Sequence, residues 1–325
     1  MPLAAAALQP LIVPQLIGIG TGGAKMTLAD LVTTKLAGYD LSAAPKKGVK
    51  LDFRDSKAVT TALASDCGRF SCAAFLSVVT IAADMEDRDS FAWALIKLYY
   101  SAFYAGHALI RTLGEGCSFF YKVHTDRIAS VADATGMAPP FRIDSGLYHC
   151  VLESEASVAT FTRAAAGSGG AHEAFWFVFG SKMKVIGEAI LMGPLPRTDA
   201  QSVFTQIDQM LRILSRKGGY SWLSGVRNDL QYRLQHQAWY PERQKTQFRR
   251  DLARSAALWT RDPMSIDMAN QRWGLHGDFV AACAFIIALC REVFGQIGAR
   301  SSEGRRSFAR TGPIAFLNDI GVASV

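Results

Sequence analysis

An arginine, an asparagine and a histidine lie in one short segment whose residue types could act on a phosphate ester. The segment reads Val226-Arg-Asn-Asp-Leu-Gln-Tyr-Arg-Leu-Gln-His236, so Arg227 and Asn228 precede His236. An arginine is a permanent cation whose planar donors match the oxygens of a phosphate group. A histidine exchanges protons near neutral pH and can serve as a general base or acid. An Arg-Asn-Asp run among apolar and aromatic residues indicates a polar site on a helix.

The relative positions of Arg227 and His236 depend on how far the helix continues. Nine helical steps put two side chains half a turn out of phase and about 13.5 Å apart along the axis. Arg233 precedes His236 by only three steps and would lie on roughly the same side. Pro241 disfavours helical backbone at the residue before it, so the helix could end near Gln235 and let His236 turn back.

Other site patterns are weaker. No GxSxG nucleophile motif occurs, and the six cysteines include no CxxC pair. We therefore expect buried reduced thiols, no metal site and no cofactor. Gly18–Gly23 matches GxGxxG and precedes Lys25, but two nearby prolines disrupt the strand that a phosphate loop needs. A turn is expected there, and a small-molecule enzyme built on this loop is a third functional hypothesis.

Basic side chains gather just after the Arg-Asn-Asp segment, on a helix predicted to begin near Pro241. Aromatic residues, including Trp239 and Phe248, are interleaved with them, which favours single-stranded nucleic acid as a partner. The formal net charge of +7 also favours a polyanion, although a solvated helix face is the alternative. The candidate nucleic-acid-binding residues are Arg233, Arg243, Lys245, Arg249, Arg250 and Arg254.

A long apolar helix must position these residues. Residues 87–113 predict a helix that is apolar on all sides, with Lys97 as the one certain charge between Phe91 and Ile110. Such a helix must be surrounded by others. We therefore predict a mainly α protein, built as a multi-helix bundle and not as a helix lying on a sheet.

The remaining pattern divides the chain into three parts. Residues 1–55 form an irregular or β-containing N-terminal segment with a candidate strand at 49–53, residues 56–260 form the helical core, and residues 261–325 form a C-terminal helical extension. Further helices are predicted at 57–65, 68–83, 123–135, 150–166, 171–191, 199–216, 219–236, 242–259, 274–297 and 304–318. The apolar N-terminus lacks the basic start of a signal sequence, and the apolar run 279–290 is too short to cross a bilayer. We expect a cytoplasmic protein without a membrane partner.

Two stretches resemble the signatures of HEPN-domain proteins. Leu98-Tyr-Tyr-Ser-Ala-Phe-Tyr-Ala-Gly-His-Ala-Leu-Ile-Arg111 resembles the first core helix of that family. The segment from Val226 to His236 resembles its arginine–histidine signature, with a longer interval between the two residues. The resemblance covers about residues 87–240 and implies a HEPN-like core within the bundle.

The resemblance also implies a function. Many HEPN proteins are metal-independent endoribonucleases of toxin–antitoxin or phage-defence systems, and they commonly dimerise. In that chemistry Arg227 would stabilise charge on the scissile phosphate, His236 would transfer a proton, and Asn228 would orient one of them. The implied partners are RNA and a second copy of the chain, as a homodimer, or a protein of a defence complex. The alternative is a catalytically inactive HEPN-like subunit for assembly, sensing or interaction, in which Arg227 and Asp229 are buried polar anchors.

Overall fold

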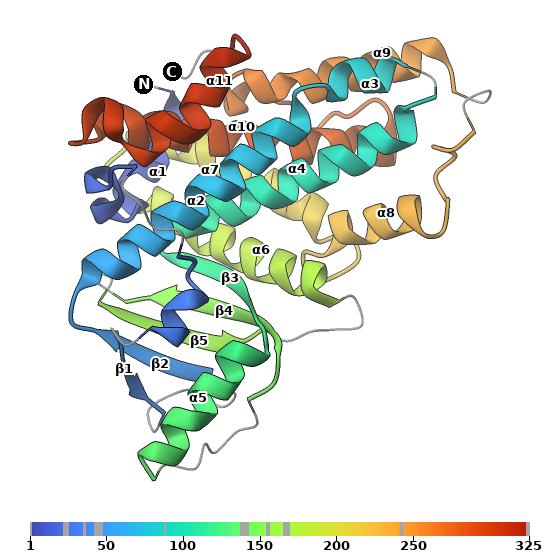
Figure 1. The fold of residues 1–325 in the computed structure, drawn as a ribbon. Helices are drawn as coiled ribbons and strands as arrows, with labels where there is room; N and C mark the ends of the chain where they lie inside the picture. The colour runs from blue at the N-terminus through green and yellow to red at the C-terminus, as the bar shows by residue number, and fades with distance from the viewer. Residues whose placement is uncertain are drawn as a thin grey trace.

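The computed structural model describes residues 2–21, 26–34, 37–41, 48–87, 89–136, 143–153, 157–164, 170–240 and 244–322. Over these residues the chain is mainly helical and also forms a five-stranded antiparallel sheet. In Figure 1 the sheet lies at one end of the molecule, the long helices are stacked beside it, and the two termini lie together at the other end.

The helix α4 (Phe91–Thr112) is the central element, which confirms the helix predicted from the apolar run. It packs against α2 (Ser56–Val78), α3 (Ile81–Glu86) and α10 (Gly274–Arg300), and it leads into the sheet at its C-terminal end. A Cβ at Gly106 would lie 3.0 Å from Phe175 Cζ, so the glycine lets α6 (Gly170–Leu191) approach closely. Because α4 is covered on several sides, most of its apolar surface is removed from water, with the exception of Trp93, which is 54 % exposed.

β-Structure was predicted only in the N-terminal segment, but the sheet also includes strands between residues 115 and 163. Its strands are β1 (Ala37–Asp40), β2 (Gly48–Phe53), β3 (Glu115–Phe120), β4 (Gly146–Leu152) and β5 (Val158–Arg163), in the order β1-β2-β5-β4-β3. The candidate strand at 49–53 is confirmed as part of β2. The helix predicted at 150–166 is wrong, because this range holds the end of β4 and all of β5. In β5, Ala159 and Phe161 are fully buried while the residues between them are less so, a period of two that suits a sheet and not a helix.

The helices α5 (Lys122–Ala134), α7 (Arg197–Leu214), α8 (Trp222–Gln231) and α9 (Thr246–Ala257) agree with the predictions in place and differ in length. The short helix α1 (Leu3–Leu8) was not predicted, and α11 (Ala315–Asp319) lies near the other end of the chain. The two helices predicted at 57–65 and 68–83 are one helix, α2, followed by α3. The range 304–318 holds short helical turns, including a π-turn with an internal proline, in place of one helix. The helix predicted at 219–236 ends at Gln231, because Leu234 and His236 have φ values of 52° and 62°, which a right-handed helix does not allow.

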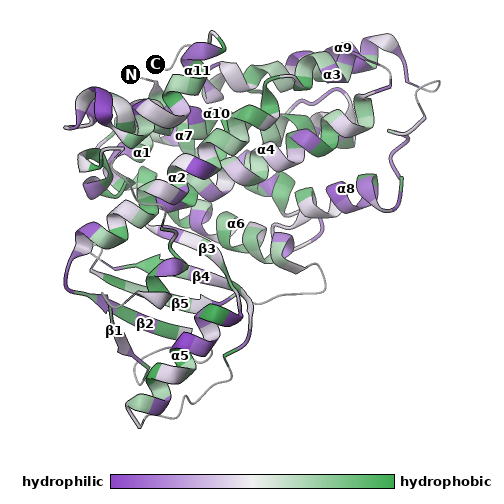
Figure 2. Cartoon of the chain, viewed as in Figure 1, coloured by the Kyte–Doolittle hydropathy of each residue, from purple (hydrophilic) through white to green (hydrophobic). Residues whose placement is uncertain are grey.

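One hydrophobic core joins the whole described chain. It includes Leu8, Leu16 and Leu51 of the first 55 residues as well as the apolar side chains of α4 and α10. Two helical stretches, Ser56–Glu86 and Gly274–Arg300, are long and apolar enough to cross a bilayer, but the most apolar part of the second is entirely buried in the protein. Figure 2 shows that α8 carries more hydrophilic residues than α4 or α10. The helix α10 is therefore a core helix, whereas α8 buries polar residues as well as apolar ones.

Pro14–Gly18 forms a 3-10 turn, so no strand leads into the glycine-rich segment through these residues. Gly22, Gly23 and Lys25 of that motif lie outside the described residues.

Candidate functional site

Arg227 is the centre of a polar cluster to which α4, α6 and α8 contribute. Its Nη1 donates to Asn228 Oδ1 over 2.7 Å. Its Nη2 donates to the Tyr100 hydroxyl over 2.7 Å and lies 3.2 Å from His172 Nε2. The structure thus brings together two of the predicted site residues, Arg227 and Asn228, and joins them to a tyrosine of the first motif.

The guanidinium of Arg227 is surrounded by aromatic rings and has no carboxylate beside it. Its Cζ lies 5.6, 5.2 and 5.5 Å from the ring centroids of Tyr99, Tyr100 and Tyr232, which stabilises the cation without neutralising it. Asp229, on the same helix, pairs instead with other cations. Arg227 is 7 % exposed and forms no ion pair with the acidic side chains that the structure describes. A buried cation without a counter-ion is costly, so the cluster favours an anion.

His172 is a neutral base in this cluster. An arginine can only donate, so His172 Nε2 accepts from Arg227 and the ring hydrogen of the neutral imidazole is on Nδ1. Nδ1 lies 2.9 Å from the Tyr99 hydroxyl, which also accepts from Trp176 Nε1 over 3.0 Å. Burial, followed by the charge of Arg227, lowers the pKa of His172 to about 4. The ring is therefore unprotonated at pH 7, with its basic nitrogen facing Arg227.

Reasoning from the sequence missed His172. It lies 55 positions before Arg227 on a different helix, so no sequence interval links the two. The available signal was weak: His172 precedes Trp176 by four residues on a strongly apolar helix, where a histidine needs a polar partner.

His236 lies away from Arg227, beyond the end of α8. Its Nε2 is 3.4 Å from Asp229 Oδ2, close enough for an ion pair but not aligned for a hydrogen bond. Arg227 and Asp229 are two helical steps apart, so their side chains leave α8 in nearly opposite directions. The His236 ring instead lies 6.2 Å from the His276 ring, at 88°. The predicted pairing of Arg227 with His236 does not occur in this structure.

The predicted nucleic-acid-binding residues have different environments. Lys245 and Arg250 are exposed. The exposed side chain of Arg233 pairs with Asp229 of α8, and that of Arg254 pairs with Asp251 on the same helix, α9. Arg249 is buried, and its guanidinium donates to the backbone carbonyls of two residues, 86 and 244. The prediction is therefore corrected for Arg249, which holds α9 in place and does not face solvent. Arg243 lies outside the described residues.

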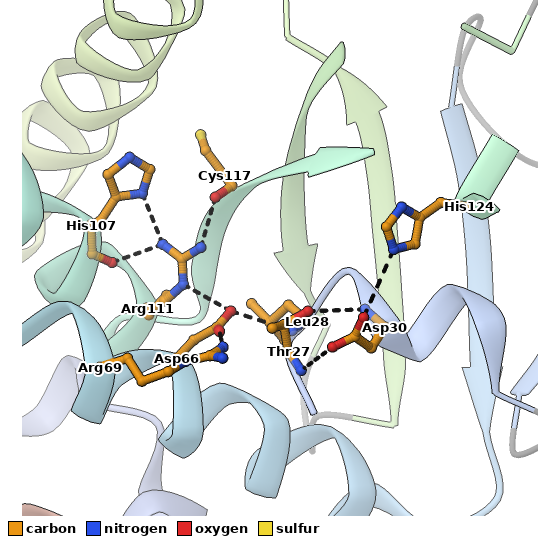
Figure 3. Close-up of polar contacts among 9 residues, drawn as sticks. All are labelled: Thr27, Leu28, Asp30, Asp66, Arg69, His107, Arg111, Cys117 and His124. Atoms are coloured by element: carbon orange, nitrogen blue, oxygen red, sulfur yellow. Dashed lines mark hydrogen bonds and ion pairs between the residues drawn. The ribbon is translucent and has the colours of Figure 1, made fainter. Parts of the chain in front are cut away.

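Arg111, the last residue of the first motif, is the centre of a second polar cluster between α2, α4 and the sheet (Figure 3). It is 1 % exposed, and its Nε lies 3.4 Å from Asp66 Oδ2. Its Nη1 donates to the His107 carbonyl over 3.0 Å and lies equally far from His107 Nδ1, while its Nη2 donates to the Cys117 carbonyl over 2.6 Å. His107 is thus a hydrogen-bonded core histidine, and its pKa is lowered by burial and by Arg111.

Asp66 joins this cluster to the N-terminal segment. It accepts from the backbone nitrogen of Leu28 over 3.3 Å and also pairs with Arg69. Beside the cluster is a cavity of about 550 Å³ that is lined in part by Phe70, Tyr104 and Tyr121. Because the donors of Arg111 are used inside the protein, we assign the cluster to holding the sheet on the helices.

A pH dependence of stability follows from His276, which is half-buried on α10. Burial, with a smaller contribution from His236, lowers its pKa to about 4. An unfolded chain has the ordinary histidine pKa of about 6.5, so it binds more protons than the folded chain between these values. Stability from this group is complete above about pH 6.5 and is lost as the pH falls toward 4. We expect the group to account for a loss of about 2 kcal/mol in unfolding free energy between pH 7.5 and 5.

Urea denaturation at both pH values would measure this loss. The matched variant is His276→Phe, which keeps a ring of similar size but cannot titrate. Its unfolding free energy should fall less over the same pH interval. An identical fall in the variant and the wild type would contradict the assignment to His276.

Among the residues that the structure describes, no three or more histidine, cysteine, aspartate or glutamate side chains lie together so that they could hold a metal ion. All six cysteines are free thiols, five of them buried. The chain matches no protein-family model, no curated protein and no solved structure.

Proposed function

We propose that this chain is an RNA-acting protein with a HEPN-like core, and that the Arg227 cluster is the site of a metal-independent endoribonuclease. The proposal depends mainly on one contact: Arg227 of the second motif donates to Tyr100 of the first, 127 positions away. Around that contact lie a neutral histidine and an asparagine, and no carboxylate pairs with the cation. A cation without a counter-ion, next to an unprotonated histidine, suits the phosphodiester of RNA. That substrate carries its own nucleophile, the 2′-hydroxyl group.

In the proposed reaction, the 2′-oxygen of a ribose attacks the adjacent phosphorus. The bond from phosphorus to the 2′-oxygen forms as the bond to the 5′-oxygen breaks, leaving a 2′,3′-cyclic phosphate and a 5′-hydroxyl end. His172 Nε2 takes the proton of the 2′-hydroxyl. The Tyr100 oxygen accepts a hydrogen bond from Arg227, so the hydroxyl hydrogen of Tyr100 remains available. Tyr100 donates this proton to the departing 5′-oxygen. Water returns the two side chains to their starting states.

Arg227 has two tasks in this scheme. It stabilises the negative charge that develops on the phosphate oxygens, which is commonly the largest single contribution to catalysis of this kind. It also releases His172, because a phosphate that binds the guanidinium withdraws the N–H group that occupies Nε2 in the free protein. His172 therefore replaces His236 as the proposed proton acceptor.

The RNA would enter from the surface at α8. Tyr232 is 68 % exposed and lies against the Arg227 guanidinium, and Tyr100, His172 and Asn228 are half-buried. All of these residues come from one chain, so a dimer is not needed to complete the cluster. Activity of this kind would suit a cytoplasmic effector of a defence or toxin–antitoxin system, acting alone, as a homodimer or with a protein partner.

The test is cleavage of single-stranded and structured RNA by the purified protein in EDTA. We expect products with 2′,3′-cyclic phosphate ends and a rate that falls by about 10²–10⁴-fold in His172→Ala, since a positioned proton acceptor contributes that much. With RNA bound to saturation, His236→Ala should cleave at the wild-type rate, because His236 lies away from the Arg227 cluster. No cleavage by the wild type, or equal cleavage by the wild type and His172→Ala, would remove the nuclease from this site.

The low exposure of Arg227 favours the second candidate, a non-catalytic HEPN-like subunit. In that case Arg227 only fixes the packing of α4, α6 and α8. A protein that binds RNA in the same assay without cleaving it would support this alternative.

A further inference from the structure

We propose that a cavity beside His236 binds an unstacked base of an RNA strand. The inference rests on the proposed function and deepens it, because it adds a second contact for the same substrate. The cavity has a volume of about 470 Å³ and lies between α4, α9 and the start of α10. Sites of this size commonly hold small planar ligands.

The walls of the cavity are aromatic. Phe248 of α9 lies 5.2 Å from the Trp273 ring at 83° and 5.3 Å from the His276 ring at 90°. Phe91, the first residue of α4, lies 5.5 Å from Phe248. Aromatic side chains that are held on different elements form a rigid surface, and the flat face of a base stacks on such a surface.

Two buried polar atoms at this cavity, His276 Nε2 and Gln244 Oε1, have no hydrogen-bond partner among the residues that the structure describes. A third, His236 Nε2, is also buried and has only the 3.4 Å contact with Asp229 Oδ2, which is not aligned for a hydrogen bond. The amide nitrogen of Gln244 donates to the carbonyls of Gln237 and Ala238 over 3.2 and 2.8 Å, so its oxygen is left as an acceptor. Buried polar atoms are nearly always hydrogen-bonded. Their concentration in one aromatic cavity points to a ligand whose edge carries both donors and acceptors, as the edge of a base does.

Charge at the rim favours a base that carries a phosphate. Lys245 lines the cavity and is exposed, and the exposed Arg250 follows on α9. Arg227 lies within the short helix α8 and His236 lies five residues after its last residue, so a strand that passes around the end of α8 would contact both the cavity and the Arg227 cluster. This segment thus contributes to two places on the substrate: Arg227 acts on the phosphodiester, and His236 helps to hold a base.

The probe is a single-stranded RNA oligonucleotide with one 2-aminopurine, whose fluorescence falls when the base stacks on an aromatic ring. We expect quenching by the wild type and about tenfold weaker binding by Phe248→Leu, which keeps an apolar side chain but removes a stacking surface. His276→Phe keeps the ring and removes the nitrogen, and it should also weaken binding. The matched control is Phe177→Leu, which changes a 55 % exposed phenylalanine on α6 and should bind like the wild type.

Separate readouts distinguish this inference from the proposed function. Arg227→Ala should lose cleavage but still quench the probe. If Phe248→Leu and His276→Phe both fold, as judged by thermal unfolding, and both bind with wild-type affinity, the base site is wrong even where the wild type cleaves RNA. Quenching that depends on Phe248 in a protein that does not cleave would keep the base site and overturn the nuclease. Adenosine monophosphate is the second arm, and tighter binding of this nucleotide than of the RNA would overturn an RNA strand as the source of the base.

Discussion

Replacing Arg227 with glutamine should lower the rate of RNA cleavage by about 10²–10³-fold, the usual effect of removing one donor that stabilises a developing anion. Glutamine keeps a polar side chain of similar reach, so hydrogen bonds to Tyr100 or Asn228 can persist while the positive charge is lost. The measurement is the single-turnover rate of cleavage of a labelled RNA in EDTA. Arg227→Lys should recover only part of the rate, because an ammonium keeps the charge but lacks the planar fork of donors.

The matched control for Arg227→Gln is Arg233→Gln, on the next stretch of the same segment. The Arg233 side chain is 66 % exposed and pairs with Asp229, so its loss should leave cleavage nearly unchanged. Stability separates the two functional hypotheses. In the catalytic case Arg227→Gln removes an uncompensated buried cation and should not lower the unfolding free energy strongly. A variant that unfolds readily and binds RNA like the wild type would instead identify Arg227 as a packing anchor.

Replacing Asp66 with asparagine should lower the unfolding free energy by about 3–5 kcal/mol, the usual cost of breaking a buried ion pair by removing one partner. Asp66 is 2 % exposed and Arg111 is 1 % exposed, so the ion pair is buried and its loss leaves the charge of Arg111 buried. The asparagine also places an amide donor among the donors of Arg111, Arg69 and the Leu28 backbone. Urea denaturation at neutral pH would measure the change.

A surface aspartate provides the comparison for Asp66. Asp251 has a side chain that is 20 % exposed and pairs with Arg254 and Arg272 over 3.6 and 3.5 Å. Asp251→Asn should cost about 0–1 kcal/mol, as surface ion pairs usually do. Equal losses in the two variants would mean that the Asp66–Arg111 pair does not hold the sheet against the helices.

The sequence by itself determined the long helices. The apolar run that becomes α4 has only one compatible environment, a core enclosed by other elements, and the amphipathic or apolar patterns of α5, α6, α7 and α10 extend over enough turns to be read locally. It also identified Arg227 and Asn228, because a polar pair next to aromatic residues on a helix stands out against its surroundings.

Only the tertiary structure decided three features: the sheet, the histidine that completes the candidate site, and the path of the chain after α8. The strands β3, β4 and β5 are six or seven residues long, too short for their patterns to be decisive alone, and each is stabilised by partner strands. His172 reaches Arg227 because α6 packs near α8. The two residues are 55 positions apart, and no spacing rule in the sequence predicts their contact. His236 turns toward His276 because Leu234 and His236 adopt positive φ, which interrupts the right-handed helix after α8. Local patterns therefore gave the elements, while long-range packing chose which side chains meet.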